Sequence, residues 1–260
     1  MGEPAVPGLE ELRPRLFGGV PESLITQVDF PRLETADLTF LREQTDVACL
    51  VADALDALGV GSVVPGAHLP PIAADQRVCG QAVTLRYEPY GGVPATHRRL
   101  GSPALAGDRD LYALAGPGDV AVISAAGQVD AAVLGDISLG FAEVAGVGGI
   151  LVDAAVRDVE ALRSRPIPVW ARGTSPMAGR FRWATAELNG PVNLAGARVH
   201  PGDLVVADGN GVCVVPLAEA ADVVAECRRL VTAEQGMTRA LAEATTLSDL
   251  VARVRGSAVL

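Results

Sequence analysis

The segment Ile150–Asp158, which reads ILVDAAVRD, carries an apolar run directly into an arginine and an aspartate. Such a run is typical of a buried strand, and α/β folds bind ligands just beyond the carboxyl ends of their strands. Arg157 could hold a substrate carboxylate through two parallel hydrogen bonds, and Asp158 could hold a divalent cation. The alternative is an exposed ion pair, because most surface pairs are structural and weak.

Asp136 stands at the start of a second candidate element, a helix whose apolar positions begin at Ile137. An aspartate there most simply caps the helix. A helix start also presents free N–H groups and the positive end of the helix dipole, which bind carboxylates and phosphates. The amides of Ile137, Ser138 and Leu139 could therefore bind an anionic substrate. If strands 120–124 and 150–156 are parallel neighbours, this helix start lies beside the Arg-Asp pair at one edge of the sheet.

Glu234 interrupts an apolar stripe along the predicted last helix. A functional explanation is a carboxylate delivered to a site between subunits. The alternatives are a drift of the helix register around Gly236, or a glutamate that simply stands at the edge of the stripe. The apolar positions of this stripe are Val223, Cys227, Leu230, Met237 and Leu241.

The composition excludes several classes of protein. The net charge of −10 argues against nucleic acid as the main partner, since that footprint is normally basic. No apolar run reaches the ~18 residues of a membrane span, and the N-terminal sequence does not read as a signal peptide. Four cysteines without a CxxC spacing are typical of small core residues in a reducing cytosol, so a cytoplasmic location is expected.

No lysine occurs in the chain, and all 21 basic side chains other than histidine are arginines. A lysine Schiff base and a Walker A phosphate loop are therefore excluded. There are three histidines and no HExxH motif. Any metal would be held mainly by carboxylates and water, which suits Mg²⁺ or Mn²⁺.

Strand and helix patterns alternate up to residue 172 and are followed by a hairpin and a final helix, which predicts a single α/β domain with a mixed sheet. We expect an irregular arm over 1–36, a core over 37–216 and a C-terminal helix and tail over 217–260. Within the core, Thr45 is the expected N-cap of a helix that ends at Gly59, and residues 129–145 are expected to be helical with a break at Gly135. The other expected elements are strands 78–87, 120–124, 150–156, 168–172, 204–207 and 212–215, a helix over 159–164, and a long helix from Leu217 towards Leu247.

Three segments resemble the RraA-like family: AAVLGDISLGFAEVAGVGGILVDAAVRDVEAL (131–162), PVWARGTSP (168–176) and HPGDLVVADGNGVCVVP (200–216). The family includes the 4-hydroxy-4-methyl-2-oxoglutarate/4-carboxy-4-hydroxy-2-oxoadipate aldolases. The resemblance implies a compact mixed-sheet α/β sandwich assembled as a homotrimer or homohexamer. It also implies a metal-dependent pyruvate aldolase, often with oxaloacetate decarboxylase activity.

The resemblance implies a role for each candidate residue. Asp158 would bind Mg²⁺ or Mn²⁺, and Arg157 would bind the carboxylate of the 2-oxo acid. Asp136 would hold a water of the metal or a catalytic water, and the amides that follow it would bind the substrate carboxylate. Glu234 matches a glutamate that the adjacent subunit contributes. One departure is the loop that often reads Pro-Gly-Asp-Asn, for which Gly107-Asp108-Arg109 is the nearest match.

The sequence is thus expected to encode a homo-oligomeric aldolase or decarboxylase. It would act on a 4-substituted 2-oxo acid through a metal-stabilised enolate and release pyruvate or a related 2-oxo acid. Two alternatives stay open at this point. One is a non-catalytic, regulatory RraA-like binding protein, since some relatives inhibit a ribonuclease. The other is a relative recruited to a different lyase step on a larger substrate.

Overall fold

The strand β2 (Val78–Pro89) joins the two halves of the main sheet in the computed structural model, which describes residues 6–256. Its first four residues pair antiparallel with β10 (Leu204–Ala207). Its remaining residues pair parallel with β3 (Val120–Ser124) and antiparallel with β7 (Trp183–Leu188). One half of the sheet is therefore antiparallel and the other is largely parallel, as a mixed-sheet α/β fold requires.

The main sheet has nine strands, with β1, β11, β10, β2, β3, β5 and β4 in spatial order and with β6 beside β5 and β7 beside β2. The strands β3, β4 and β6 all run parallel to β5, so their carboxyl ends lie at the same edge. A separate hairpin is formed by β8 and β9. The bounds not yet given are β1 (Ser62–Pro65), β4 (Ala132–Leu134), β5 (Gly149–Val156), β6 (Val169–Thr174), β8 (Val192–Leu194), β9 (Ala197–Val199) and β11 (Gly211–Val215).

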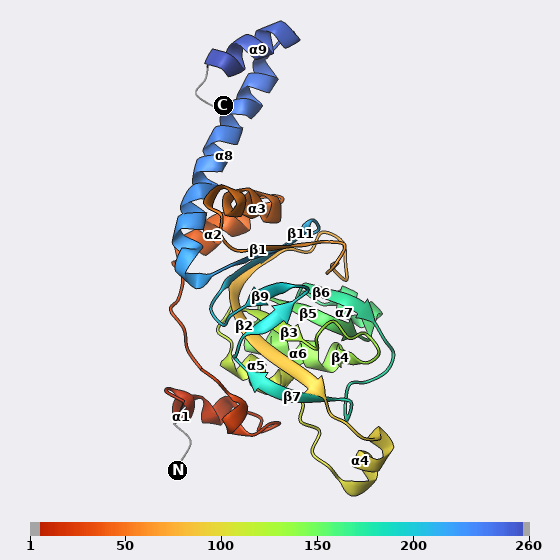
Figure 1. Cartoon of the computed structure of the whole chain (residues 1–260). Coiled ribbons are helices and arrows are strands. Elements are labelled where there is room, and N and C mark those ends of the chain that lie inside the picture. The colour runs from red at the N-terminus through yellow and green to blue at the C-terminus, as the bar shows by residue number, and fades with distance from the viewer. Residues whose placement is uncertain (1–5, 257–260) are drawn as a thin grey trace.

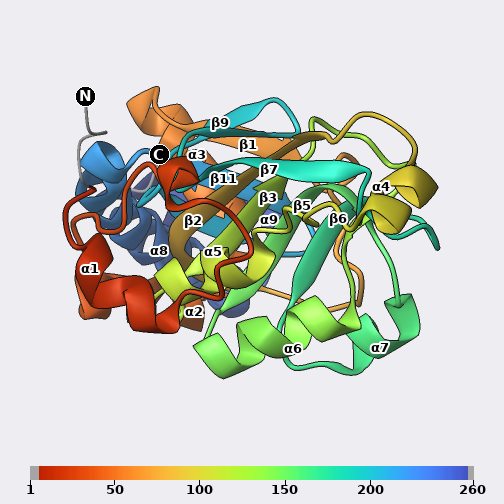
Figure 2. The same ribbon diagram turned by 90° about the horizontal axis from the view of Figure 1, so that it is seen from below.

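Helices cover the two halves on opposite sides (Figures 1 and 2). The helices α5 and α6 lie on the parallel half, whereas α2, α3 and α8 lie on the antiparallel half. The distal part of α8 extends away from the sheets and carries α9 at its end (Figure 1). The helices are α1 (Leu9–Leu12), α2 (Thr35–Glu43), α3 (Val47–Leu58), α4 (Pro94–Leu100), α5 (Asp108–Leu114), α6 (Asp136–Ala145), α7 (Val159–Ser164), α8 (Ala220–Glu243) and α9 (Leu247–Gly256).

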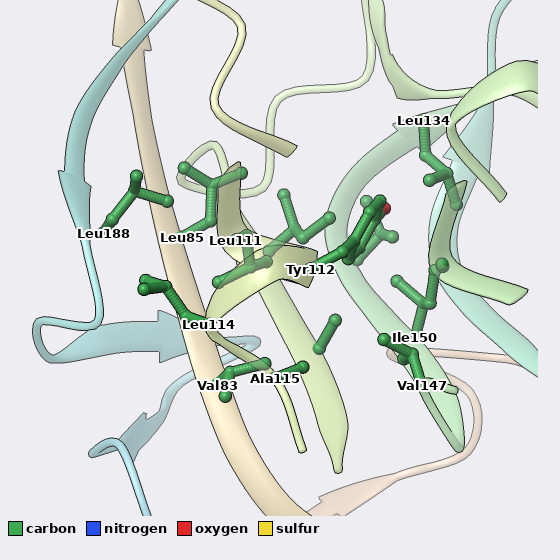
Figure 3. Packing of buried hydrophobic residues seen from close by; sticks show 14 of the residues in the cluster. Val83, Leu85, Leu111, Tyr112, Leu114, Ala115, Leu134, Val147, Ile150 and Leu188 are labelled. Carbon is green, nitrogen blue, oxygen red and sulfur yellow. The ribbon is translucent and has the colours of Figure 1, made fainter. Parts of the chain in front are cut away.

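Three hydrophobic clusters hold these layers together. In the first, Leu111 and Leu114 of α5 pack over Val83 and Leu85 of β2 (Figure 3). The second lies between the two halves of the sheet and contains the fully buried Trp170. The third joins the antiparallel half to α3 and α8. Because strands such as β10 are buried on both faces, their sequences are continuously apolar and do not alternate.

Several sequence predictions are confirmed, among them the strand 120–124, the helix 159–164 and the parallel pairing of β3 with β5. Two local predictions are wrong. The residue before the first helical residue of α3 is Asp46, and neither it nor Thr45 caps the helix with its side chain. Residues 132–134 form the strand β4 where a helix was expected, because this edge segment pairs with the end of β5.

The N-terminal segment packs on the chain's own core. Residues 6–34, which precede α2, contain α1 and two three-ten turns, Arg13–Arg15 and Glu22–Leu24. Thr26 donates from its backbone amide to the carbonyl of Leu188, the last residue of β7, at 2.9 Å. The side chains of this segment that lie in the core are Leu9, Val20, Ile25, Val28 and Phe30. Among residues 6–256, no helix combines the length and apolar character needed to cross a bilayer.

Candidate active site

The strands β4 and β5 end side by side, and each is followed at once by charged residues. The amide of Arg157 donates to the carbonyl of Leu134 at 2.9 Å, which ties the two strand ends together. The amide of Asp136 donates to Asp158 Oδ2 at 3.1 Å. The predicted meeting of the helix start with the Arg-Asp pair is therefore confirmed, and it occurs at the carboxyl ends of the parallel strands.

Gly135 allows this close approach. A Cβ atom at this position would lie 2.6 Å from Asp158 Oδ2 and 3.1 Å from both Cγ and Nε of Arg157. The first of these distances is shorter than any normal van der Waals contact, so a larger residue would displace the carboxylate. The sequence Gly-Asp at the start of α6 thus serves the packing of Arg157 and Asp158 against the helix.

Arg157 and Asp158 form a loose pair that is partly open to solvent. Arg157 Nε lies 3.4 Å from Asp158 Oδ2, and the two side chains are 39% and 40% exposed. Within residues 6–256 this is the one polar contact of the Arg157 side chain. The terminal nitrogens of the guanidinium are therefore available to a ligand, in the planar arrangement that suits a carboxylate.

Asp136 differs from its simplest prediction, because it is the first residue of α6 and Gly135 is the cap, with no side-chain capping bond. Asp136 Oδ1 accepts a hydrogen bond from Nε of Arg165 at 2.8 Å, and a terminal nitrogen of the same guanidinium lies 2.8 Å from it in an ion pair. Arg165 also donates to Glu143 Oε2 at 2.8 Å. The hydrogen bond to Asp136, followed by that to Glu143, raises the pKa of the Arg165 guanidinium. Asp136 Oδ2 is left without a hydrogen bond from any described residue.

The amides after Asp136 are not equivalent. The amide of Leu139 donates to the carbonyl of Gly135 at 3.1 Å, and the Leu139 side chain is fully buried. The expectation that this amide binds an anion is therefore wrong, because the helix itself uses it. The amides of Ile137 and Ser138 precede the first hydrogen bond within the helix and remain free in the way typical of a helix start. The Ile137 side chain is exposed.

Ser138 connects α6 to a buried polar network on α5. Its Oγ donates to Asp108 Oδ2 at 2.5 Å and lies 3.0 Å from the Tyr112 hydroxyl. Burial raises the pKa of the Tyr112 phenol, and the negative charge of Asp108 raises it further. Sequence reasoning did not assign a role to Asp108 or Tyr112. The available signal was the segment Gly107-Asp108-Arg109, the nearest match to a loop of the family, which the structure places at the start of α5.

These elements surround a pocket of about 640 Å³. Its charged lining residues are three arginines and one aspartate, namely Arg109, Arg157, Arg180 and Asp108. Arg109 Cζ lies 4.5 Å from the centroid of the Phe141 ring, and Arg180 Cζ lies 4.9 Å from that of the Phe181 ring. Among residues 6–256, no carboxylate forms a salt bridge with Arg109 or Arg180. The pocket is thus locally basic in an acidic protein, which favours an anionic ligand.

The donor chemistry at Asp158 fits Mg²⁺ or Mn²⁺ bound by one carboxylate. Magnesium is commonly held by one or two carboxylates together with water and substrate oxygens. Asp158 is partly exposed next to Arg157, which lines the pocket. The backbone amide of Asp136 contacts Asp158, whereas the Asp136 carboxylate contacts Arg165. In the described range, no three His, Cys, Asp or Glu side chains gather as a metal-binding cluster. A resident cation would therefore take most of its ligands from water and substrate.

Glu234 lies elsewhere in this chain. It is exposed on α8 and borders a separate cleft of about 870 Å³ between α3 and α8, which is also lined by Asp46, Cys49 and Asp53. Within one chain it does not contribute to the pocket beside Arg157. The view in Figure 1 places α8 away from α6 and α7. Its expected approach to the site of a neighbouring subunit stays a prediction.

Comparisons with known proteins give the context of this site. A family model described as RraA-like, Aldolase/RraA, matches residues 48–214. A protein of Halalkalibacterium halodurans named "putative 4-hydroxy-4-methyl-2-oxoglutarate aldolase" is 29% identical over 213 residues, which are 81% of this chain and 92% of that protein. Two crystal structures are each 26% identical. An uncharacterized protein of Pseudomonas syringae pv. tomato has a TM-score of 0.69 over 85% of this chain and 99% of its own. Streptomyces coelicolor RraAS2, described as an unusual member of the RNase ES inhibitor RraA protein family, has a TM-score of 0.66 over 80% and 98%.

Proposed function

Since the chain belongs to the RraA-like family, we propose that it is a divalent-metal-dependent carbon–carbon lyase that cleaves a 4-substituted 2-oxo acid and releases pyruvate or a related 2-oxo acid. The observation that carries this proposal is the placement of Arg157 and Asp158 against the start of α6, beside a pocket that is lined by Arg109, Arg157 and Arg180. The similarity to a protein named as an aldolase supports the same class of reaction.

Substrate binding is assigned to Arg157 and the first turn of α6. The guanidinium of Arg157 would bind the carboxylate of the 2-oxo acid through two hydrogen bonds, since its terminal nitrogens are available. The free amides of Ile137 and Ser138 would bind an oxygen of the same anion at the positive end of the helix. The substrate would thus be fixed at one end, with its 4-substituent directed into the rest of the pocket.

Asp158 would hold Mg²⁺ or Mn²⁺. When bound, the cation would supply positive charge beside the carboxylate and 2-oxo oxygens of the substrate. Asp158 also accepts the amide of Asp136, so its carboxylate is oriented by the backbone of α6. The absence of lysine from the chain means that charge stabilisation cannot come from a lysine Schiff base.

The proposed cleavage conserves atoms and electrons. A proton leaves the 4-hydroxyl group, the electron pair of the C3–C4 bond stays on the 2-oxo fragment as an enolate, and a proton added at C3 gives pyruvate. Asp136 Oδ2 is proposed to orient the water that carries the proton. Glu234 of a neighbouring subunit is proposed to act in the same proton transfer, which requires a homotrimer or homohexamer.

The decisive experiment measures pyruvate release from a panel of 4-hydroxy-2-oxo acids and from oxaloacetate, with added Mg²⁺ or Mn²⁺ and with EDTA. Metal-dependent release that EDTA abolishes supports the proposal. Release that is unaffected by EDTA contradicts the role of the cation. No release from any member of the panel would overturn the aldolase function and favour a regulatory, non-catalytic role or a different lyase step.

A further inference from the structure

Residues 17–19 of the N-terminal segment form a thin wall of the candidate active site. Phe17, Gly18 and Gly19 line the 640 Å³ pocket that also contains Arg157. Behind them lies a second cavity of about 240 Å³, and Gly18 borders both spaces. The wall is therefore only one backbone segment thick, with open volume on each side into which it could move.

A single buried carboxylate holds this wall in place. Asp110 Oδ1 accepts the amides of Phe17 at 2.6 Å and Gly18 at 3.1 Å, and its Oδ2 accepts the amide of Gly19 at 2.8 Å. Asp110 is 2% exposed, and these amides are its hydrogen-bond donors among the described residues. Successive amides that converge on one anion make a strong, charge-assisted set of bonds.

The two glycines allow the wall to adopt this shape. Gly18 has a φ of +65°, a left-handed conformation that favours glycine. A Cβ atom on Gly19 would lie 2.7 Å from the carbonyl oxygen of Ala106, so a side chain there would push the wall off the loop that precedes α5. The sequence Phe-Gly-Gly is thus suited to wrapping around the Asp110 carboxylate.

The wall also contacts the helix that begins at Asp136. The Phe17 ring stands edge-on to the Phe141 ring of α6, with 5.2 Å between the centroids and 89° between the planes. Arg109 of α5 also lies over the Phe141 ring. The Phe17 side chain nevertheless keeps 57% of its surface exposed, so a ligand in the pocket can reach it.

We propose that Asp110 is a positioning residue that holds residues 17–19 as the specificity wall of the pocket. The wall would limit the size of the 4-substituent that the enzyme accepts, while Arg157 and Asp158 act on the invariant 2-oxo acid end. This inference rests on the proposed lyase function. Loss of the clamp would let the wall move into the 240 Å³ cavity and enlarge the pocket.

The test uses Asp110→Asn in the full-length protein. The new NH₂ group would face a backbone N–H, so one or more clamp bonds would be lost. We expect kcat/KM for 4-hydroxy-2-oxo acids with large 4-substituents to rise relative to small ones by roughly tenfold, about what one methylene contributes to discrimination. The matched control is Asp119→Asn. Asp119 is 4% exposed and anchors the same N-terminal segment through Arg32, but it does not line the pocket. An equal change in both variants would overturn the proposal.

A second readout does not depend on turnover. Of the two tryptophans, Trp183 lines the pocket and Trp170 is fully buried, so acrylamide quenching reports mainly on Trp183. Asp110→Asn should increase the quenching constant of Trp183 at least twofold over Asp119→Asn. Equal quenching constants would contradict the proposal that Asp110 holds residues 17–19 in place.

Phe17→Ala keeps the backbone amides that Asp110 accepts. It should relax the selectivity for the 4-substituent without loss of fold, because the Phe17 ring is exposed. If the wild type releases no pyruvate while quenching responds as expected, the proposed lyase function is contradicted. The role of Asp110 in holding residues 17–19 is then still supported.

Discussion

The amide of Asp136 donates to Asp158 Oδ2 at 3.1 Å, although the two residues are 22 positions apart in the sequence. This bond places the carboxylate proposed to hold a cation against the positive end of α6. The backbone amide at the helix start thus orients the Asp158 carboxylate, at the end of the helix where the dipole favours negative charge.

Asp158→Asn should abolish activity and its metal dependence while the protein remains folded. Asparagine tolerates the φ of 59° that Asp158 adopts, and the ion pair it loses is partly exposed, so little stability depends on it. Isothermal titration with Mn²⁺ and thermal unfolding measure both effects. Glu160→Gln, an exposed change on α7, is the charge-matched control. Wild-type Mn²⁺ binding in Asp158→Asn would disprove the assignment.

Arg157→Ala should mainly raise KM. Removal of a charge-assisted hydrogen bond typically costs ~1.5–3 kcal/mol, so substrate binding should weaken roughly tenfold or more. Steady-state kinetics and competition by oxalate measure this loss. Arg163→Ala removes an exposed arginine that donates to the carbonyl of Ile72 outside the pocket, and it should leave KM unchanged. Equal KM values in the two variants would contradict the role of Arg157.

Gly135→Ala should inactivate the protein through the geometry of Asp158. The added Cβ would meet the carboxylate at 2.6 Å and move it away from the amide of Asp136. Gly140→Ala in the same helix is the matched control, because its Cβ would meet nothing closer than 3.7 Å. That control should keep activity and gain up to about 1 kcal/mol in the free energy of unfolding. An active Gly135→Ala protein would mean that the close contact has no catalytic importance.

Glu234 should act across a subunit interface. Asp158→Asn and Glu234→Ala proteins should each be inactive, and a mixture should regain part of the activity because some interfaces would contain both intact residues. The measurement is pyruvate release after mixing under conditions that allow subunit exchange. Exchange is checked by mass spectrometry of differently tagged subunits. A mixture that stays inactive after demonstrated exchange would exclude the shared site.

The parallel strands and the meeting of Arg157 with the start of α6 could be predicted from the sequence. Apolar runs that end in charged residues mark buried strand ends, and parallel order brings such ends together. The strand β4 could not be predicted, because it forms through edge pairing with β5 and has no alternating pattern of its own. The clamp of Asp110 on Phe17 was equally hidden, since it depends on a contact between residues 93 positions apart. The use of the Leu139 amide follows from where α6 begins, and pattern analysis does not fix a helix start to one residue.

The strand β2 has a consequence for how the molecule unfolds. Its first residues belong to the antiparallel half and its later residues to the parallel half, so neither half possesses a complete set of strands without it. Separating the halves would leave one side of this strand without ladder hydrogen bonds and would expose the apolar cluster around Trp170. Unfolding should therefore be cooperative across both halves, and a calorimetric scan should give a single transition in which the candidate active site is lost together with the whole sheet.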